Sequence, residues 1–229
     1  FTSFKNTDFK VGEEIIIDFA APMLVEGKTT FTDFSIYDAS YDGTVYDVSG
    51  FNNDGLVSSQ DTSPIFVKDD TAPSGSYALF DGVDDGINIP DTIILQNNYT
   101  IAFWVFVSIN DEREIFFGNH DINPCFNIEK KSGRALRIYY NSGILDIASG
   151  NILYNSWNYI VVTIDKINNK IKGYINGTII IDKSTDSSFE FKSFSTNFRI
   201  GRDLRTAANG GNTPLNGKIS DFKIYSTAL

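Results

Sequence analysis

The side chains able to act in acid–base or nucleophilic chemistry form no evident catalytic arrangement along this chain. The one histidine, His120, lies in the run Gly-Asn-His-Asp at residues 118–121, and the spacing pairs no serine or cysteine nucleophile with it. The one cysteine, Cys125, opens the apolar run 125–128, which is typical of a core residue. The cluster Asp-Glu-Arg-Glu at residues 111–114 is typical of an exposed charged loop. We therefore expect a protein that is not an enzyme.

Oxygen ligands for a hard cation gather in one early loop. Asp47 and the Asn-Asn-Asp run at residues 52–54 supply carboxylate and amide oxygens in a stretch rich in turn formers. Calcium takes about six to eight oxygens, and a loop can add its backbone carbonyls to the set. The same side chains could instead only cap turns through local hydrogen bonds. The sequence leaves both interpretations open.

A third group of residues has the chemistry to bind a sugar. Sugars stack on aromatic rings and accept hydrogen bonds from polar side chains, and aromatic residues and arginines occur near the expected strand ends. The burial trend nevertheless places most of these aromatics in the core. The segment 205–212 has small residues and two glycines, which suits a loop that closes over a ligand. The ligand-binding candidates are His120, Arg137, Tyr139, Arg202 and Arg205.

Composition narrows the class of partner. The net charge of −10 argues against nucleic acid, because phosphate binding needs a basic face. The same charge leaves carboxylates available for a cation. No apolar run approaches the ~20 residues of a membrane-spanning helix. We therefore expect neither nucleic-acid binding nor membrane insertion.

The elements that must position these residues are β-strands. Short β-branched and aromatic runs alternate with turn residues, and no stretch keeps a helical period. Residues 99–107 are apolar on both faces, so we place this strand in the middle of a sheet that packs on another. Asn176-Gly177 between apolar runs predicts a hairpin with a type I′ turn, whereas residues 58–76 read as a surface loop. The residues expected to be largely buried are Phe103, Val105, Trp157, Val161 and Ile175.

The first part of the chain differs from the rest. Residues 14–27 predict one or two strands broken at Pro22. The phrase at residues 21–27 resembles the last strand of jelly-roll modules in bacteriophage tail fibres, and a strand that extends the main sheet is the equal alternative. We assign residues 1–34 to the end of an upstream module or a linker, and 35–229 to the main domain. The start at Phe1, without a signal segment, leads us to expect an excerpt of a longer polypeptide.

Six phrases, in order, resemble the concanavalin A-like sandwich in its laminin G-like form. They lie at residues 47–55 (Asp-Val-Ser-Gly and Asn-Asp-Gly), 80–85 (Phe-Asp-Gly-Val-Asp-Asp), 99–105, 157–163, 174–177 (Tyr-Ile-Asn-Gly) and 216–225. The resemblance implies an all-β, antiparallel β-sandwich of jelly-roll type, preceded by one or two short strands.

The resemblance also bears on chemistry. Glycanases of this fold carry Glu, one residue, Asp, two residues, Glu along one strand, and this pattern does not occur here. Related domains often hold a structural calcium between the early loop and an aspartate of the final strand, which corresponds to Asp221. The resemblance thus implies a calcium site made of Asp47, Asn53 and Asp221.

Because this fold hosts lectins, adhesion modules, glycanases and spacers, it does not fix the function. We predict a non-catalytic module that binds a surface glycan, in the host-recognition or adhesion part of a bacteriophage tail or fibre protein. The alternative is a structural or protein-binding spacer of a bacterial surface protein, and a glycanase or sialidase is less favoured. The expected location is the virion or the bacterial surface, with homo-oligomerisation inside a larger assembly.

Overall fold

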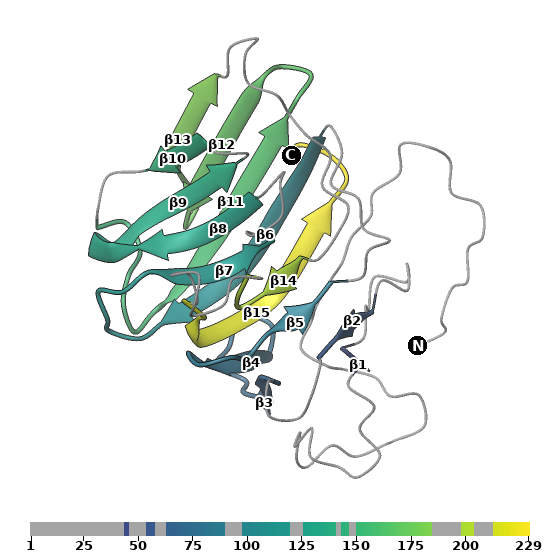
Figure 1. Ribbon diagram of the computed structural model, residues 1–229, viewed down its shortest axis with the longest axis vertical. Helices are drawn as coiled ribbons and strands as arrows, with labels where there is room; N and C mark the ends of the chain where they lie inside the picture. Colours follow the sequence, from purple (N-terminus) through teal and green to yellow (C-terminus); the bar gives the residue numbers. More distant parts are fainter. Residues whose placement is uncertain are drawn as a thin grey trace, which may run out of the picture.

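The computed structural model shows two antiparallel β-sheets packed face to face (Figure 1). It describes residues 44–45, 54–57, 63–89, 98–119, 126–140, 150–184, 198–203 and 213–229, together with the backbone of 143–146. The predictions for residues 1–34 and for Asp47, Asn53, His120 and Arg205 lie outside this part of the chain. The expected all-β sandwich is confirmed.

One sheet has eight strands, and its longer members lie in front in Figure 1. In spatial order the strands are β1 (Thr44–Val45), β2 (Gly55–Leu56), β5 (Ile87–Asn88), β14 (Arg199–Ile200), β7 (Glu114–Gly118), β8 (Phe126–Lys131), β9 (Ala135–Tyr140) and β10 (Gly143–Asp146). A single 3₁₀ turn, η2 (Ser132–Arg134), joins β8 to β9.

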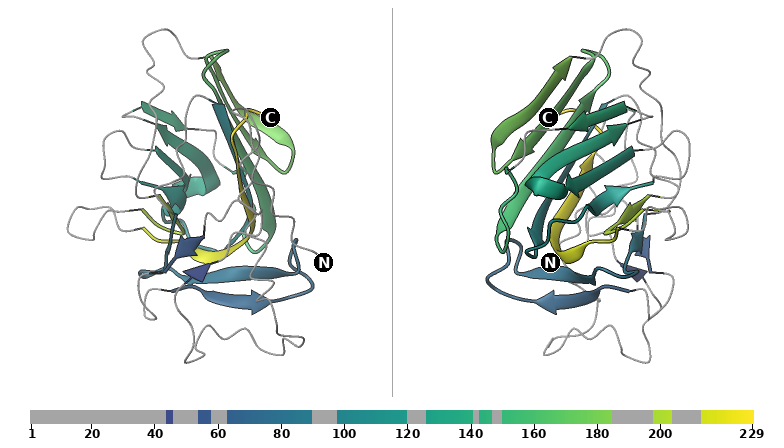
Figure 2. Two further views of the ribbon diagram at one scale, coloured as in Figure 1. Left: turned by 90° about the vertical axis from the view of Figure 1, so that its right-hand side faces the viewer. Right: turned by 60° about the vertical axis from the view of Figure 1, so that its left-hand side comes forward.

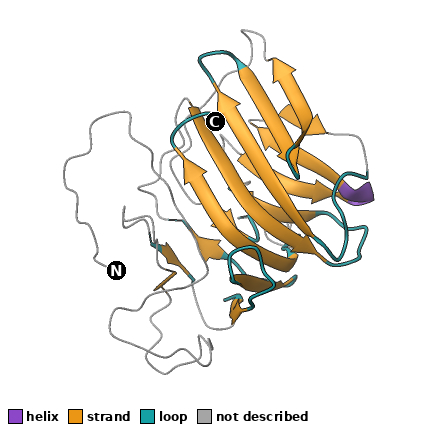
Figure 3. Ribbon diagram, turned by 180° about the vertical axis from the view of Figure 1, so that it is seen from behind, coloured by secondary structure: helices purple, strands orange, loops and turns teal. Residues whose placement is uncertain are grey.

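The other sheet has seven strands and faces the viewer in Figure 3. Its order is β13 (Thr178–Ser184), β12 (Lys170–Ile175), β11 (Trp157–Asp165), β6 (Asn98–Val107), β15 (Asn216–Tyr225), β4 (Ser76–Asp81) and β3 (Ile65–Lys68). The left panel of Figure 2 shows the two layers edge-on, with β8–β10 in teal and β11–β13 in green. The prediction of a loop throughout 58–76 is wrong at β3, which pairs with β4.

The core between the sheets is built largely from aromatic rings. Phe103 stacks on Phe222 with ring centroids 5.4 Å apart, and it meets Phe116 edge-on at 5.9 Å. Phe117 stacks on Phe198 at 4.9 Å. These rings come from both sheets, so the core contacts hold the two sheets together.

The core predictions for Phe103, Val105 and Ile175 are confirmed, because all three are buried. Those for Trp157 and Val161 are wrong: both are only half-buried. The reason is the two-residue period of β11, in which the even-numbered positions 158–164 are buried and the odd-numbered side chains 157–161 turn outward. An apolar run on both faces therefore did not mean burial on both faces.

The turns behave as their residue types predict. Asn176 and Gly177 have φ of 51° and 78°, the positive values that a type I′ hairpin turn requires. In the turn after β4, Gly82 has φ of 82°, and the Asp81 carboxylate accepts a hydrogen bond from the Val83 amide at 2.7 Å. Across the described part of the chain, no helix has the length and apolar character needed to cross a membrane.

Candidate ligand-binding face

A row of polar positions crosses the outer face of the eight-stranded sheet. The strand register pairs Asn88 with Arg199, Arg199 with Gly118, Gly118 with Asn127, and Asn127 with Tyr139. Directly paired residues project on the same face of a sheet. Their neighbours along the strands, such as Ile87, Ile200, Ile128 and Ile138, are buried in the core. The row therefore faces away from the core.

Gly118 allows the neighbouring side chain in this row, that of Asn127, to pack directly over its backbone. A Cβ atom at this position would lie 1.9 Å from Oδ1 of Asn127 and 2.9 Å from the Phe126 carbonyl oxygen. Only glycine leaves room there for the Asn127 side chain. Asn127 is fully buried, although it sits on the outer face.

A second row of residues lies beside the first and is held together by ion pairs. Glu129 of β8 pairs in register with Arg137 of β9 and with Ile115 of β7. The Glu129 carboxylate accepts from Nε of Arg113 at 3.1 Å and from Nη1 of Arg137 at 3.2 Å. Glu129 is almost fully buried, whereas the two arginine side chains are partly exposed. One carboxylate thus orients two guanidiniums at the surface.

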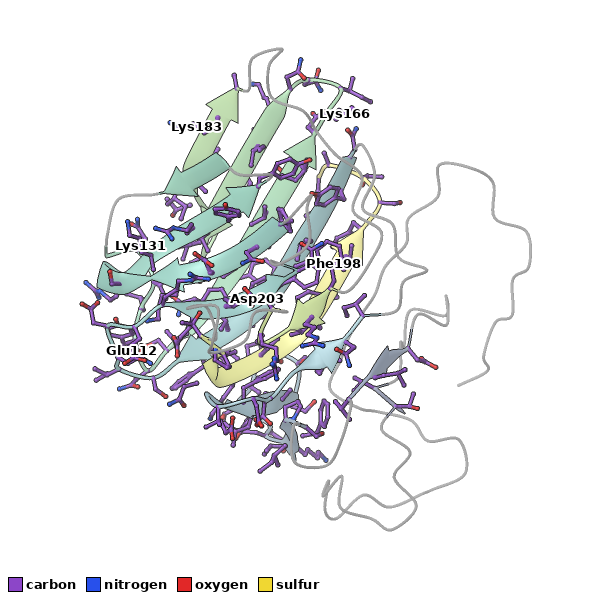
Figure 4. The ribbon with its side chains drawn as sticks, viewed as in Figure 1. Glu112, Lys131, Lys166, Lys183, Phe198 and Asp203 are labelled. Atoms are coloured by element: carbon purple, nitrogen blue, oxygen red, sulfur yellow. The ribbon has the colours of Figure 1, made fainter. Side chains whose placement is uncertain are left out.

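Asp203 lies against the first row. Nδ2 of Asn127 donates to Oδ2 of Asp203 at 3.3 Å, and Asp203 is only 2% exposed. Burial raises the pKa of this carboxyl to about 7, against the lowering influence of Asn127, Arg113 and Arg202. Figure 4 shows Asp203 over the middle of the front sheet, whereas Glu112 and Lys131 lie toward its left margin.

Two further arginines approach Asp203 from β14 and the residues after it. Arg199 is half-buried, and burial, followed by the charge of Arg202, lowers its pKa. Nη1 of Arg202 donates to the backbone carbonyl of Asp84, and its aliphatic chain lies over Gly86. A Cβ atom at residue 86 would come within 2.6 Å of Cδ of Arg202, so the glycine makes room for this side chain. The Asp/Gly turn after β4 thereby fixes a guanidinium at the face.

The predicted ligand-binding residues Arg137, Tyr139 and Arg202 lie on or beside this one face. The prediction missed Asn127, Glu129, Arg199 and Asp203 as parts of it. A signal existed for two of them, because Asn127 and Glu129 alternate with apolar residues in β8 and must share a face. The proximity of Arg199 and Asp203 depends on pairing between distant strands, which the local sequence does not specify.

Of the predicted calcium ligands, the structure describes Asp221 alone. This residue has φ of 52° beside the register shift in β15, and its carboxylate pairs with Nζ of Lys223 at 2.8 Å. Burial and then the charge of Asp221 raise the pKa of Tyr159, so Asp221 lies near the outer face of the seven-stranded sheet. The calcium site with Asp47 and Asn53 stays a prediction.

Three carboxylates also meet in the turn after β4. Ligand oxygens of Asp81, Asp84 and Asp85 lie within 4.8 Å of one another. Oδ2 of Asp85 accepts from the Asp81 amide at 2.8 Å, and burial raises the pKa of Asp85 to about 6. These hydrogen bonds account for the cluster as a structural feature of the turn.

Comparison with known proteins agrees with this architecture. A family model described as the concanavalin A-like lectin/glucanases superfamily matches residues 81–229, which is more than half of the chain. The chain belongs to this superfamily. All the described strands from β5 to β15, and hence both polar rows, lie within the matched part.

Two curated phage proteins are similar to part of this chain. The non-toxic nonhemagglutinin type C of Clostridium botulinum C phage is 28% identical over 106 residues. That stretch is 45% of this chain and 9% of the relative, so the chain spans less than a tenth of the length of the curated relatives it matches.

Solved structures share the fold. Domain 4 of an extracellular arabinanase from Geobacillus stearothermophilus, solved with arabinotriose, has a TM-score of 0.55 at 21% identity over 73% of this chain and 77% of that one. The CBM40 domain of a Ruminococcus gnavus sialidase, bound to α2,3 sialyllactose, has a TM-score of 0.50 at 18% identity over 58% and 77%. A Trypanosoma rangeli sialidase gives 0.59 at 13% identity over 82% and 29%.

Proposed function

We propose that this domain is a non-catalytic module that binds a surface glycan through the outer face of the eight-stranded sheet. The observation that supports this most is the polar row in which Tyr139, Asn127 and Arg199 lie on consecutive or near-consecutive strands. It offers the half-buried ring of Tyr139 and the guanidinium of Arg199, while the buried Asn127 lies between them and donates to Asp203. A sugar is recognised by just this combination of a ring to stack on and several directed hydrogen bonds.

Two comparisons support this ligand class. The arabinanase domain was solved with an arabinose oligosaccharide and the CBM40 domain with a sialylated one. Both are accessory domains of larger enzymes by their descriptions, and both share the sandwich. This similarity supports a sugar as the ligand, and the residues of the polar face support that face as the place where it binds.

The geometry of the carboxylates favours binding over hydrolysis. A glycosidase needs two carboxyl groups that reach the sugar from either side of the scissile bond. On this face Glu129 and Asp203 are each only 2% exposed, and Glu129 is engaged by two arginines. We therefore propose that these carboxyls orient the arginines and do not contact the substrate as acid or nucleophile.

The biological setting of the module is supported by a different comparison. We propose that the module serves host recognition or adhesion in a phage tail protein or a related surface protein. The similarity to a protein of a Clostridium botulinum phage supports this setting. The corresponding location is extracellular or on the virion.

A glycan array probed with the purified chain and a matched pair of variants tests the function. Tyr139→Ala removes the ring from the polar face, and Tyr174→Ala removes a half-buried tyrosine from β12 of the other sheet. We expect the first variant to lose glycan retention at least tenfold and the second to keep it. If no glycan is retained by the parent chain, or if both variants bind equally well, the proposed function is wrong.

A further inference from the structure

Two arginines on the polar face have hydrogen-bonding capacity that the described residues leave unfilled. Within the described residues, no hydrogen bond or ion pair reaches the half-buried guanidinium of Arg199. Nε of Arg202 is buried and has no partner among these residues either. A guanidinium carries five donors and keeps its charge, so donors left unpaired away from water cost free energy. An acceptor supplied by a ligand would recover that cost.

The face also gathers four guanidiniums in a chain of net charge −10. Its guanidiniums belong to Arg113, Arg137, Arg199 and Arg202, and its carboxylates belong to Glu129 and Asp203. Arg113 and Arg137 share Glu129. Asp203 acts on Arg199 and is itself acted on by Arg202, whose aliphatic chain lies against the acidic turn at residues 84–86. Asp203 has a pKa of about 7 and is therefore only partly ionised at neutral pH.

We propose that the glycan bound by this face is acidic, and that its carboxylate binds Arg199 and Arg202. This inference rests on the proposed function and specifies its ligand class. The planar fork of a guanidinium matches a carboxylate, and the charge-assisted hydrogen bonds are stronger than those to a neutral hydroxyl. A neutral sugar would offer hydroxyl oxygens to these guanidiniums but no negative charge.

The spacing of the row suits a short oligosaccharide. Arg199 and Tyr139 lie on β14 and β9, with β7 and β8 between them. Neighbouring strands are ~4.8 Å apart, so the two positions are separated by about 14 Å. Gly118 lies between them and adds no side chain. An acidic sugar at Arg199 thus leaves room for one or two neutral rings toward Tyr139.

Asp203 makes the binding depend on pH. The groups acting on it are Arg113 from the segment before β7, Asn127 and Glu129 from β8, and Arg199 and Arg202 from β14 and the residues after it. When Asp203 is protonated, Arg199 and Arg202 lack its negative charge and favour an external anion. When it ionises, it supplies that charge and repels the ligand carboxylate. Acidic glycans should therefore bind less tightly as the pH rises from 6 to 8.

The first experiment uses an array that carries sialylated and uronic-acid glycans, each paired with its methyl ester. The same array also carries neutral and sulfated glycans. The parent chain should bind at least one carboxylated glycan and bind the corresponding ester at least tenfold less. Equal binding to acid and ester, or binding confined to neutral or sulfated glycans, overturns this inference and leaves the proposed function intact. Absence of any binding overturns both.

The second experiment tests whether the carboxylate of the glycan binds at the two arginines. Arg199→Gln removes one charge from the face, and Lys172→Gln removes one from β12 of the opposite sheet as the matched control. The first should weaken binding of the carboxylated glycan at least tenfold with little effect on its ester, and the second should change neither. If both variants bind the acidic glycan like the parent, the assignment is wrong. Near-identical circular dichroism spectra show that both variants are folded.

The third experiment uses pH to separate electrostatics from packing. Asp203→Asn keeps the shape of the side chain and its neutral state. Its affinity for the carboxylated glycan should stay nearly constant between pH 6 and 8, whereas that of the parent should fall several-fold. The same fall in both proteins would show that Asp203 does not act on the ligand.

Discussion

The outer faces of the two sheets differ in how completely their side chains satisfy one another. On the seven-stranded sheet, Trp104 packs on Tyr159 with ring centroids 4.9 Å apart, and Nζ of Lys218 lies 4.3 Å from the centroid of the Tyr77 ring. Asp221 and Lys223 form an ion pair there. On the eight-stranded sheet, Arg199 and Arg202 have donors that find no partner in the part of the chain that the structure describes. Aromatic content alone would favour the outer face of the seven-stranded sheet as a binding site. Hydrogen-bond donors without partners favour the outer face of the eight-stranded sheet instead.

The largest expected effect comes from the core that both faces share. Phe103→Ala removes a fully buried ring that stacks on Phe222 and meets Phe116, so it should lower the free energy of unfolding by about 3–5 kcal/mol. Urea denaturation followed by fluorescence measures this. A midpoint equal to that of the parent chain would contradict the assignment of Phe103 to the centre of the core.

The next prediction compares one acidic residue from each face. Glu129→Ala leaves Arg113 and Arg137 without the buried carboxylate between them and should cost about 3 kcal/mol. Asp221→Ala breaks a partly exposed pair with Lys223 and should cost less than about 1 kcal/mol. Denaturation of both variants at one pH tests the difference. Equal losses would mean that the two faces are organised alike.

A comparable effect should follow pH. The pKa of Asp203 is raised in the folded protein from 3.8 to about 7, so the folded state holds this proton more tightly than the unfolded chain does. Its contribution to stability is complete below pH 4 and is lost as the pH rises through 7. Because a rise of about three pKa units corresponds to at most about 4 kcal/mol, Asp203→Asn should stabilise the protein at pH 8 by about 2–4 kcal/mol relative to its effect at pH 4.

Asp165 provides the control for this pH effect, because hydrogen bonds, first from the Asn168 side chain, lower its pKa. Asp165→Asn should show the opposite sign, with any loss of stability appearing above pH 4. Melting temperatures of both variants between pH 4 and 8 measure the two slopes. Parallel pH profiles for both variants and the parent would show that neither carboxyl is perturbed.

A further expected effect concerns the predicted calcium site at Asp47, Asn53 and Asp221. A cation that binds only the folded form adds about 2.7 kcal/mol at a concentration a hundredfold above its dissociation constant. Chelation should lower the melting temperature by a few degrees, added Ca²⁺ should restore it, and Asp47→Ala should abolish the response. A melting temperature indifferent to chelator, in protein that elemental analysis finds metal-free, would contradict the site.

The sequence allowed the fold to be predicted because its local signals agree with one another. The Asn176-Gly177 turn, the apolar strand β6 and the alternation along β9 all act within one or two elements. The error at Trp157 and Val161 arises because an outward-facing apolar side chain can still have apolar neighbours: Trp157 of β11 meets the ring of Phe106 in β6. Hydrophobicity marks contact with other apolar groups and not the face on which it occurs.

The candidate site could be predicted only in part. Arg137 and Tyr139 were predicted from their chemistry, as an arginine on a strand and an aromatic residue near a loop end, and the two-residue period of β9 puts them on one face. The position of Arg199 beside Gly118, and of Asp203 beside Asn127, depends on strands that are distant in sequence and meet only in the folded sheet. The raised pKa of Asp203 depends on burial, which is a property of the assembled face.

The most direct test of the polar face is a titration of ¹⁵N-labelled protein with the tightest-binding glycan from the array, followed by NMR. We expect the largest shift changes at Gly118, Asn127, Tyr139 and the Arg199 side chain, and almost none at Trp104 and Tyr159 of the other sheet. Saturable shifts centred on Trp104 and Tyr159, with the polar row unchanged, would contradict the account.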